Sequence, residues 1–494
     1  MARPGVKRAI RLTLFCLGSL VLSARELRLA VAEYPASIHP VYTVSETGQA
    51  VINKLYHSLF SHDGSGRLTP ELVESWQRTG DDSVLLLTLK PGFFFPSGRM
   101  LDAGDVAATF ALLKDPRFAY PYRSDLDFIA AVEPIAARTV RLRLRHPHAA
   151  WRTYLTFKVL AAEEIRQANP ATFARSLPGG TGPYHVVRQD AARELVLERN
   201  PGYRGALPAT RLVYEVQLDP RTMPQKLVAG EVDAGEIQPE DAELFPRRSD
   251  WSRRFRLIPY EKFGFTYLAF NTRRPAIDRE FRRTVYRRLV AGTFLSRFLR
   301  GRGRPVYSPV LALGEEKPLA IATPRPLPPG SRRVRLLTNS ESRLRRHFVL
   351  FAAEELKKDG IVAEPVFLEY HSFMKAMRGG DFDLAVSAFL LDLDYNVRDI
   401  LASDGVCNYA GWADPSLDRL LQEGLAEMDE GRRRQVYRRV HQRWATELPL
   451  LPLFSLYYHM GVAPSLRLAG APVRIIGSCG DFFYRIGDWA LTPP

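Results

Sequence analysis

The sequence predicts an α/β protein with more than one domain, and three observations support this prediction. The 494 residues, 46% of them hydrophobic, are enough to bury a large core and fit roughly two or three domains. Residues 45–160 mix short helical patterns with strand patterns, which is typical of an α+β block. After the proline-rich segment 322–333, strand and helix patterns alternate as β-α-β-α-β, the order of a lobe with a parallel sheet.

Several strands are predicted in the first half of the chain. Residues 26–35 alternate apolar and polar side chains and end at a proline, which predicts a strand. The same pattern predicts strands at 83–90 and 139–146. Further strands are expected after the glycine-rich turn 178–184, at 184–189, 193–200 and 210–217.

The second half predicts the alternating lobe. Strands are expected at 334–339, 361–370 and 384–391, with helices at 340–360 and 371–380 between them. Asp392 and Asp394 follow the third strand, at the carboxyl edge where such sheets meet their ligands. Asp414 is placed to cap a further helix, a second helix carries Val436, Val440 and Trp444, and residues 448–462 read as a last strand.

The N-terminus has the layout of a signal peptide. Four basic residues precede an apolar run from Leu12 to Leu22, and Ser23 and Ala24 close the run, so cleavage is expected after Ala24. The run is well short of the roughly 20 apolar residues that a membrane span needs. We therefore expect a soluble, exported protein in the periplasm.

The basic charge and the cysteines carry less information. Loss of residues 1–24 lowers the formal charge from +15 to +11, a surplus that would suit nucleic acid. The arginines, however, are interleaved with apolar residues at helical spacing, which predicts solvated helix faces and no nucleic-acid partner. Only Cys407 and Cys479 remain after cleavage, and the sequence leaves their pairing in an oxidising compartment open.

Several separated motifs resemble one family. They are LYHSLFSHDGSGRLTPELVESW (55–76), LKPGFFFPSGRMLDAGDVAATF (89–110), GGTGPYHVV (179–187), LERNPGYRG (197–205), FNTRRPAIDREFRRTVYRRLV (270–290), GDFDLAVSAF (380–389), NYAGWADPSLDRLLQEG (408–424) and ELPLLPLF (447–454). In this order and spacing, the chain resembles the family 5 extracellular solute-binding proteins, which are periplasmic receptors of ABC importers for peptides, nickel chelates and related solutes.

The resemblance implies a type II periplasmic-binding-protein clamshell of two lobes and three domains, joined by hinge strands. After the signal peptide (1–24), lobe 1 would comprise residues 25–48, 161–264 and 460–494, with 49–160 as its extension, and lobe 2 would comprise 265–459. We expect the hinge crossings near 265–272 and 453–461. It further implies a monomer that binds a small solute, expected to be an oligopeptide or dipeptide, and delivers it to the membrane subunits of an ABC permease.

The resemblance also implies a ligand site at the end of the third strand of lobe 2. In peptide-binding members, an aspartate here pairs with the α-amino group of the ligand, and an ungapped count places it at Asp392, with Phe389 as the preceding aromatic residue. The backbone around Ser387, Ala388 and Leu390 would add an extended peptide as a strand. Tyr34 and Tyr42 follow the first strand and are expected either at the cleft or in the core.

Departures from the family pattern leave the identity of the solute open. The family's usual continuation after the aspartate is replaced by LDYNVRDIL, and Val386 stands where an arginine for a ligand carboxylate is expected. A metal chelate, with His371 or His459 as a contact, and an oligosaccharide are the alternatives.

Asp392 and Asp394 also spell the D-x-D of metal-dependent glycosyltransferases, whose carboxylates suit magnesium or manganese. No glycine-rich phosphate loop accompanies them, and Asp394 alone is explained as a polar strand end or helix cap. No Ser-His-Asp ordering, nucleophile elbow or CxxC is present. We therefore expect no catalysis, no cofactor and no metal.

Overall fold

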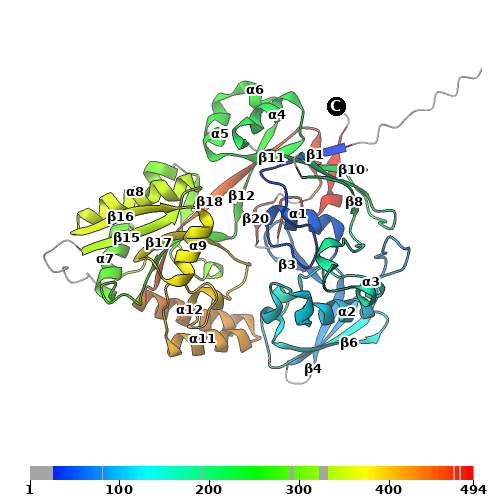
Figure 1. Cartoon of the computed structure of the whole chain (residues 1–494), viewed down its shortest axis with the longest axis horizontal. Helices are drawn as coiled ribbons and strands as arrows, with labels where there is room; N and C mark the ends of the chain where they lie inside the picture. The colour runs from blue at the N-terminus through cyan, green and yellow to red at the C-terminus, as the bar shows by residue number, and fades with distance from the viewer. Residues whose placement is uncertain are drawn as a thin grey trace, which may run out of the picture.

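The computed structural model describes residues 26–79, 82–191, 193–217, 219–289, 294–299, 301–321, 332–470, 473–477 and 480–492. The signal-peptide prediction and Cys479 lie outside these residues, so the predicted cleavage and the Cys407–Cys479 pairing are not described. The chain forms two lobes that lie side by side (Figure 1). Within the described residues, no helix combines the length and the apolar character needed to cross a membrane.

Lobe 1 is built on the first half of the large sheet. Strand β1 (Glu26–Val31) runs parallel to β10 (Arg211–Val216), and β9 (Glu194–Arg199) and β8 (Tyr184–Asp190) extend the sheet in antiparallel pairs. On its other side β1 meets β11 (Ala234–Ile237). The predicted alternation of β1 holds, because Leu27 and Leu29 are buried in the core while their neighbours are partly exposed. A cap formed by α4 (Met223–Ala229), α5 (Pro239–Leu244) and α6 (Ser249–Ser252) covers the top of this lobe (Figure 1).

The extension of lobe 1 contains a separate four-stranded antiparallel sheet in the order β4-β5-β7-β6. Its strands are β4 (Val73–Thr79), β5 (Val84–Leu89), β6 (Ile129–Ala136) and β7 (Thr139–Leu144), and β2 (Phe60–His62) pairs with β3 (Leu68–Pro70) nearby. Helix α2 (Ala103–Lys114) packs on this sheet and begins with a capping box between Asp102 and Asp105. The buried residues of the extension and of the β1 sheet form one continuous core.

Lobe 2 has the predicted alternating order. It runs β15 (Arg332–Asn339), α8 (Arg343–Lys357), β16 (Ile361–Leu368), α9 (Tyr370–Gly379) and β17 (Leu384–Leu390), with the three strands parallel in the order β16-β15-β17. Asp414 caps α11 (Pro415–Ala426) as predicted, since its side chain accepts hydrogen bonds from the backbone of Ser416 and Leu417. Helix α12 (Glu430–Glu447) packs on α11.

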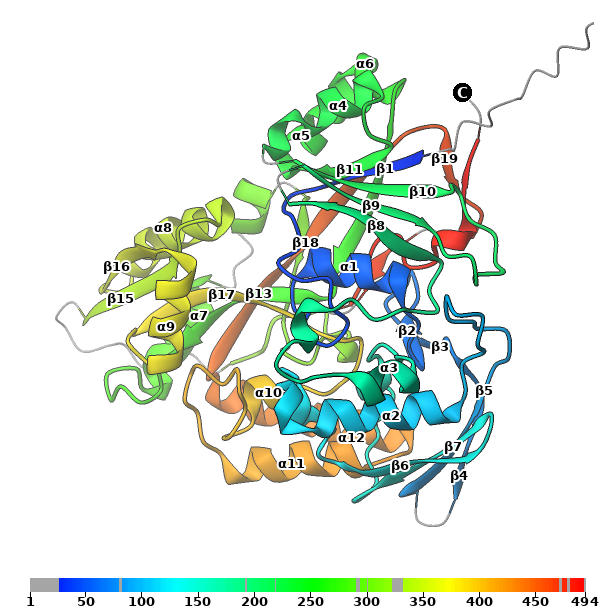
Figure 2. The same cartoon turned by 45° about the vertical axis from the view of Figure 1, so that its right-hand side comes forward.

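Two connections join the lobes, strand β18 (Leu450–Val462) and the link between β12 (Arg256–Lys262) and β13 (Gly264–Phe270). Strand β18 pairs with β13 and β14 (Gly303–Pro305) through its first half and with β11 and β12 through its second half. Figure 2 shows it running from one lobe to the other. Between β12 and β13 only Phe263 intervenes, so the chain changes lobes there, just before the predicted range 265–272. The remaining elements are α1 (Glu46–Leu55), α3 (Ala162–Gln167), α7 (Arg279–Leu289), α10 (Arg398–Leu401), β19 (Leu466–Leu468), β20 (Ile475–Ile476) and β21 (Trp489–Leu491).

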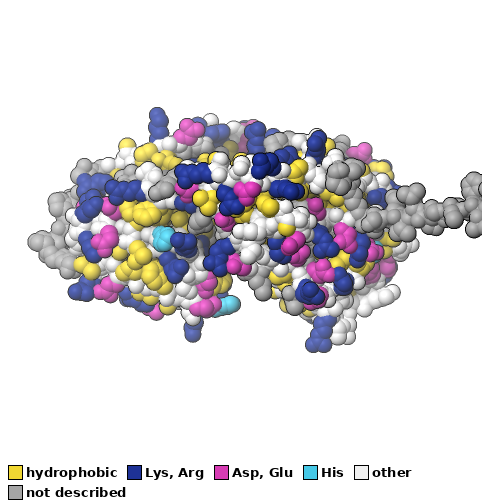
Figure 3. Space-filling view, turned by 90° about the horizontal axis from the view of Figure 1, so that it is seen from above, with side chains coloured by type: hydrophobic (Ala, Val, Ile, Leu, Met, Phe, Trp, Pro, Cys, Tyr) yellow, Lys and Arg dark blue, Asp and Glu magenta, His cyan; other side chains and the backbone are white. Residues whose placement is uncertain are grey.

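The arginines of α12 largely have acidic partners. Arg432 pairs with Glu427, Arg439 with Glu423 and Arg443 with Asp414. The upper face of the molecule, away from α12, likewise has basic and acidic side chains interspersed (Figure 3). The arginine-rich helix is thus a solvated face crossed by ion pairs, in line with the reading from its periodicity.

Candidate functional site

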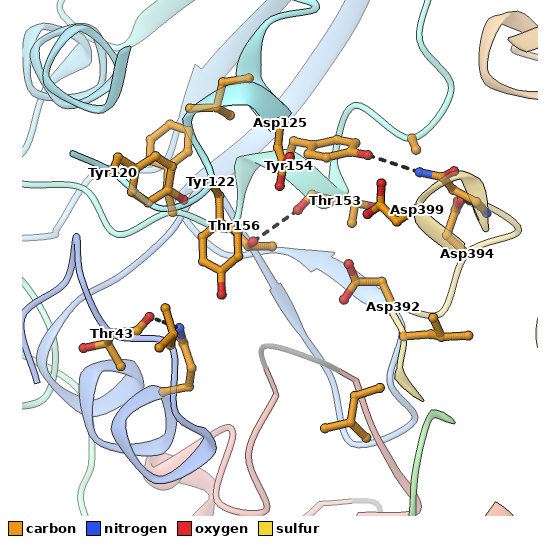
Figure 4. Close-up of a pocket in the computed structure, with 18 of the residues that line it drawn as sticks. Thr43, Tyr120, Tyr122, Asp125, Thr153, Tyr154, Thr156, Asp392, Asp394 and Asp399 are labelled. Carbon is orange, nitrogen blue, oxygen red and sulfur yellow. Dashed lines mark hydrogen bonds between the residues drawn. The ribbon is translucent and has the colours of Figure 1, made fainter. Parts of the chain in front are cut away.

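A cavity of about 360 Å³ lies between the two lobes (Figure 4). From lobe 1 it is lined by residues 40–52, which include the start of α1, and by the loops 120–126 and 150–158. Lobe 2 contributes residues 390–400, the segment that follows β17. The volume is at the lower end of the range for small-molecule sites, and interfaces between lobes are a usual place for such sites.

The segment after β17 is fixed by Asp394. Its Oδ1 and Oδ2 accept hydrogen bonds from Nη2 and Nη1 of Arg433 in α12, at 2.6 and 2.8 Å. Oδ1 also accepts from the backbone of Asn396 at 2.7 Å. The Arg433 guanidinium in turn lies 5.5 Å from the ring centres of both Tyr395 and Tyr437. Asp394 therefore serves to hold this segment in place.

Asp392 occupies the cavity wall, with 27% of its side chain exposed. Its Oδ1 lies 3.6 Å from Nε2 of His62, which comes from β2 in lobe 1. Burial lowers the pKa of the His62 imidazole, although the nearby charge of Asp392 acts in the opposite direction. The imidazole is therefore predominantly neutral at neutral pH and does not cancel the charge of Asp392.

Direct contacts hold the lobes together beside the cavity. The side-chain amide of Asn396 donates to the hydroxyl of Tyr154 at 3.1 Å (Figure 4), and the backbone N–H of Ala149 donates to the carbonyl of Leu425 at 2.6 Å. Both contacts join the extension of lobe 1 to lobe 2. The cavity is thus bounded by two lobes that touch at its rim.

Two further carboxylates, Asp125 from lobe 1 and Asp399 from lobe 2, belong to the lining. Figure 4 shows both directed toward the same space as Asp392. Partial loss of hydration, together with the charge of Asp399, raises the pKa of Asp125 to about 6. Loss of hydration also raises the pKa of Asp399. Sequence reasoning missed both, because neither stands in a motif and no pattern indicates that the two loops meet.

Of the residues predicted from the sequence, Leu390 and Asp392 lie in the cavity lining. Ser387 and Ala388 pair with Tyr267 and Thr266 of β13, and the ring of Phe389 stacks on Tyr267 with centroids 4.1 Å apart. Tyr42 packs against His39 and Phe173, beside the lining residues Val41 and Thr43. Tyr34 donates to the side chain of Gln189 at 3.5 Å.

The two histidines considered for a chelate lie elsewhere. His371 begins α9 with 91% of its side chain exposed and contacts Glu369. His459 lies within β18, where it pairs with Ile237 and Pro259. Among the described residues, no group of three His, Cys, Asp or Glu side chains is arranged to hold a metal ion.

The fold agrees with comparisons to known proteins. The sequence profile of the bacterial extracellular solute-binding proteins, family 5, matches residues 67–401. Among solved structures, the oligopeptide-binding protein AppA of Bacillus subtilis, in complex with a nonapeptide, is 19% identical with a TM-score of 0.78, covering 95% of this chain and 99% of AppA. NikZ of Campylobacter jejuni, in complex with Ni(L-His), is 21% identical with a TM-score of 0.80, covering 94% of this chain and 99% of NikZ. The fold is therefore the two-lobed type II periplasmic-binding-protein fold.

Sequence relatives give the same assignment. Protein XP55 of Streptomyces lividans is 25% identical over 449 residues, which are 85% of this chain and 81% of XP55. Di/tripeptide-binding protein 2 of Pseudomonas aeruginosa is 25% identical over 513 aligned positions, covering 90% of this chain and 93% of that protein. The chain belongs to the family 5 extracellular solute-binding proteins, a family of substrate-binding components of ABC importers.

Proposed function

We propose that the protein captures an oligopeptide or dipeptide in the interlobe cavity and delivers it to the membrane subunits of an ABC permease, without catalysing a reaction. The observation that carries this proposal is Asp392 on the cavity wall, at the carboxyl end of β17. A charged amine that loses water between closing lobes needs a carboxylate in its place. The predicted export would put this monomeric receptor in the periplasm.

The edge of β17 supports a peptide as the solute. Strand β13 pairs with β17 along its length, whereas β15 pairs with it at Leu384 and Ala385. Within the described chain, no strand pairs with β17 beyond Ala385 on the β15 side. That edge offers backbone groups to an extended peptide by strand addition.

The charge of the cavity separates the alternatives. A neutral oligosaccharide would leave the acidic wall without a counter-charge, and the lining contains no histidine for a chelated metal. The D-x-D transferase is disfavoured because both oxygens of Asp394 accept hydrogen bonds from Arg433. A metal-binding pair would need both carboxylates to face the ion.

Closure would work through the two hinge segments, Phe263 and the middle of β18. Rotation about these segments moves lobe 2 against lobe 1 with little change inside either lobe. A solute that contacts both walls favours the closed arrangement by its extra contacts in that state. The permease would then bind the closed form of the receptor.

Asp392→Asn is expected to weaken binding of dialanine at least about tenfold, because a charge-assisted hydrogen bond contributes about 1.5–3 kcal/mol. Isothermal titration calorimetry measures the change, and the melting temperature without solute is expected to stay the same. Glu364→Gln, at an exposed carboxylate of the same lobe, is the matched control and should bind like the native protein. Equal affinities for all three proteins would remove Asp392 from the site.

Native mass spectrometry of protein purified without denaturation tests the solute class directly. A retained peptide mass is the expected result. A retained chelate or sugar would replace the peptide proposal. Binding of nothing from a panel of peptides, chelates and oligosaccharides would contradict the receptor function itself.

A further inference from the structure

The charged groups of the cavity wall do not balance. The lining contains four carboxylates, Asp125, Asp392, Asp394 and Asp399, and one amine, Lys158. Arg433 offsets Asp394 from behind. Three carboxylates then face one ammonium group, so the wall carries two negative charges more than it carries positive ones.

The excess is concentrated at Asp125 and Asp399. In the part of the chain that the structure describes, no ion pair within 4.0 Å joins either carboxylate to a lysine or arginine. Arg398 acts on Asp399 from a greater distance and is itself paired with Asp404. Asp125 belongs to lobe 1 and Asp399 to lobe 2, so the two like charges face each other across the boundary between the lobes (Figure 4). Bringing the lobes together therefore costs electrostatic free energy unless a cation lies between them.

His62, which contacts Asp392 from outside the cavity lining, does not supply the missing positive charge. The side chain is 3% exposed, its Nε2 has no hydrogen-bond partner among the described residues, and this atom lies 3.6 Å from Oδ1 of Asp392. A protonated imidazole here would neutralise one carboxylate of the wall, but burial disfavours that form. His62 is thus buried beside Asp392 in its neutral form and adds no positive charge to the wall.

We propose that the preferred solute carries two positive groups, one at Asp392 and a second between Asp125 and Asp399, as in a dipeptide with a lysine side chain. This inference rests on the proposed function and narrows its solute class to dications. Tyr154, whose hydroxyl accepts the Asn396 hydrogen bond, and Tyr122 stand beside the second position. Their rings suit the aliphatic part of a lysine chain. The second cation would also bridge the lobes, so it favours closure.

The preference for a dication is expected to fall as the pH is lowered through about 6. Above this pH, Asp125 is ionised and accepts the cation directly; below it, the carboxyl group carries a proton that binding must release. Burial raises the pKa of Asp125 most, the charges of Asp399 and Asp127 raise it further, and the Ser124 hydroxyl lowers it. Affinity for lysyl-alanine should drop by up to about tenfold per pH unit in this range, and Asp125→Asn should show a weaker dependence. A preference for lysyl-alanine over norleucyl-alanine that is constant across this range would contradict a role for Asp125.

The decisive experiment compares matched probes that differ in one positive charge. The pairs are lysyl-alanine with norleucyl-alanine and alanyl-lysine with alanyl-norleucine, and cadaverine serves as a dication without a peptide bond. Calorimetry on the native protein, Asp125→Asn, Asp399→Asn and the surface control Glu364→Gln is expected to show lysine preferred over norleucine at least about tenfold in one pair. Both aspartate variants should lose this preference and keep their affinity for norleucine, which shows that they are folded.

The outcomes separate this inference from the proposed function. Equal binding of lysine and norleucine probes, both weakened by Asp392→Asn, overturns the second cation position and leaves the peptide receptor standing. Binding of cadaverine but of no dipeptide, with dependence on Asp125 and Asp399, supports the dication and overturns the peptide. A lysine preference that survives both substitutions, or no binding of any cation, overturns the inference.

Discussion

Lys54→Met is expected to lower the free energy of unfolding by about 3–5 kcal/mol, because it leaves a buried carboxylate without its cation. Nζ of Lys54 lies 2.8 Å from Oδ1 of Asp481, and the two side chains are 1% and 5% exposed. Asn53 donates to the other oxygen of Asp481 at 2.9 Å. The pair ties the last turn of α1 to the C-terminal segment 480–492. Urea and thermal unfolding, followed by circular dichroism, measure the loss.

Two control variants separate burial from charge. Lys357→Met removes a lysine whose partner, Glu354, is also on the surface, and a change of about 0–1 kcal/mol is expected. Lys54→Met combined with Asp481→Leu removes both buried charges and should recover much of the loss, since a buried pair replaced by apolar groups is often tolerated. A single variant as stable as the native protein would mean that Asp481 is solvated in the absence of Lys54.

The same pair bears on binding, because α1 lines the cavity. Gln49 and Ile52 belong to the lining, one turn before Lys54. If the pair fixes the helix against lobe 1, then the double variant should keep solute affinity while the single variant loses part of it. The position of α1 therefore links the core of lobe 1 to the site.

The sequence predicts the alternating lobe well because each of its elements is specified locally. The apolar run of β17 and the apolar stripe of α8 show in the periodicity of the sequence which side chains are buried. Asp414 caps α11 by accepting hydrogen bonds from residues that follow it closely in the sequence. Strand β18 was also predicted from its apolar run. Its crossing between the lobes was expected only from the family resemblance, since no local pattern encodes pairing with β13 and β12 at opposite ends.

The site is less predictable because it is assembled from distant loops. Asp392 was predicted from the resemblance of a single strand, β17, to the family pattern. Asp125 and Asp399 meet only after the extension of lobe 1 folds against lobe 2, and neither loop has a periodicity that indicates this. The replacement of the usual family continuation by LDYNVRDIL was the one available signal, since it introduces Asp399. The charged partner of Asp394 is distant in the sequence, because Arg433 reaches it from α12.

Arg433→Met is expected to lower the free energy of unfolding by about 3–5 kcal/mol and to weaken solute binding as well. Arg433 and Asp394 are 5% and 17% exposed, and their two parallel hydrogen bonds hold the segment that carries Asp392 and Asp399. Without Arg433, the carboxylate of Asp394 has to be solvated by water, and the segment 390–400 is held less tightly. Unfolding in urea and calorimetry with dialanine measure the two effects.

Arg432→Met is the matched control, because it removes an arginine from the adjacent position of α12. Arg432 is 68% exposed and pairs with Glu427 at the surface, so we expect a change of about 0–1 kcal/mol and native affinity. A loss of stability in Arg433→Met with unchanged affinity for dialanine would show that β17 positions Asp392, and that the paired hydrogen bonds between Arg433 and Asp394 do not. If Arg433→Met lowers both the stability and the affinity for dialanine while Arg432→Met lowers neither, then α12 orients the solute-binding segment. Arg433 contacts that segment and not the solute.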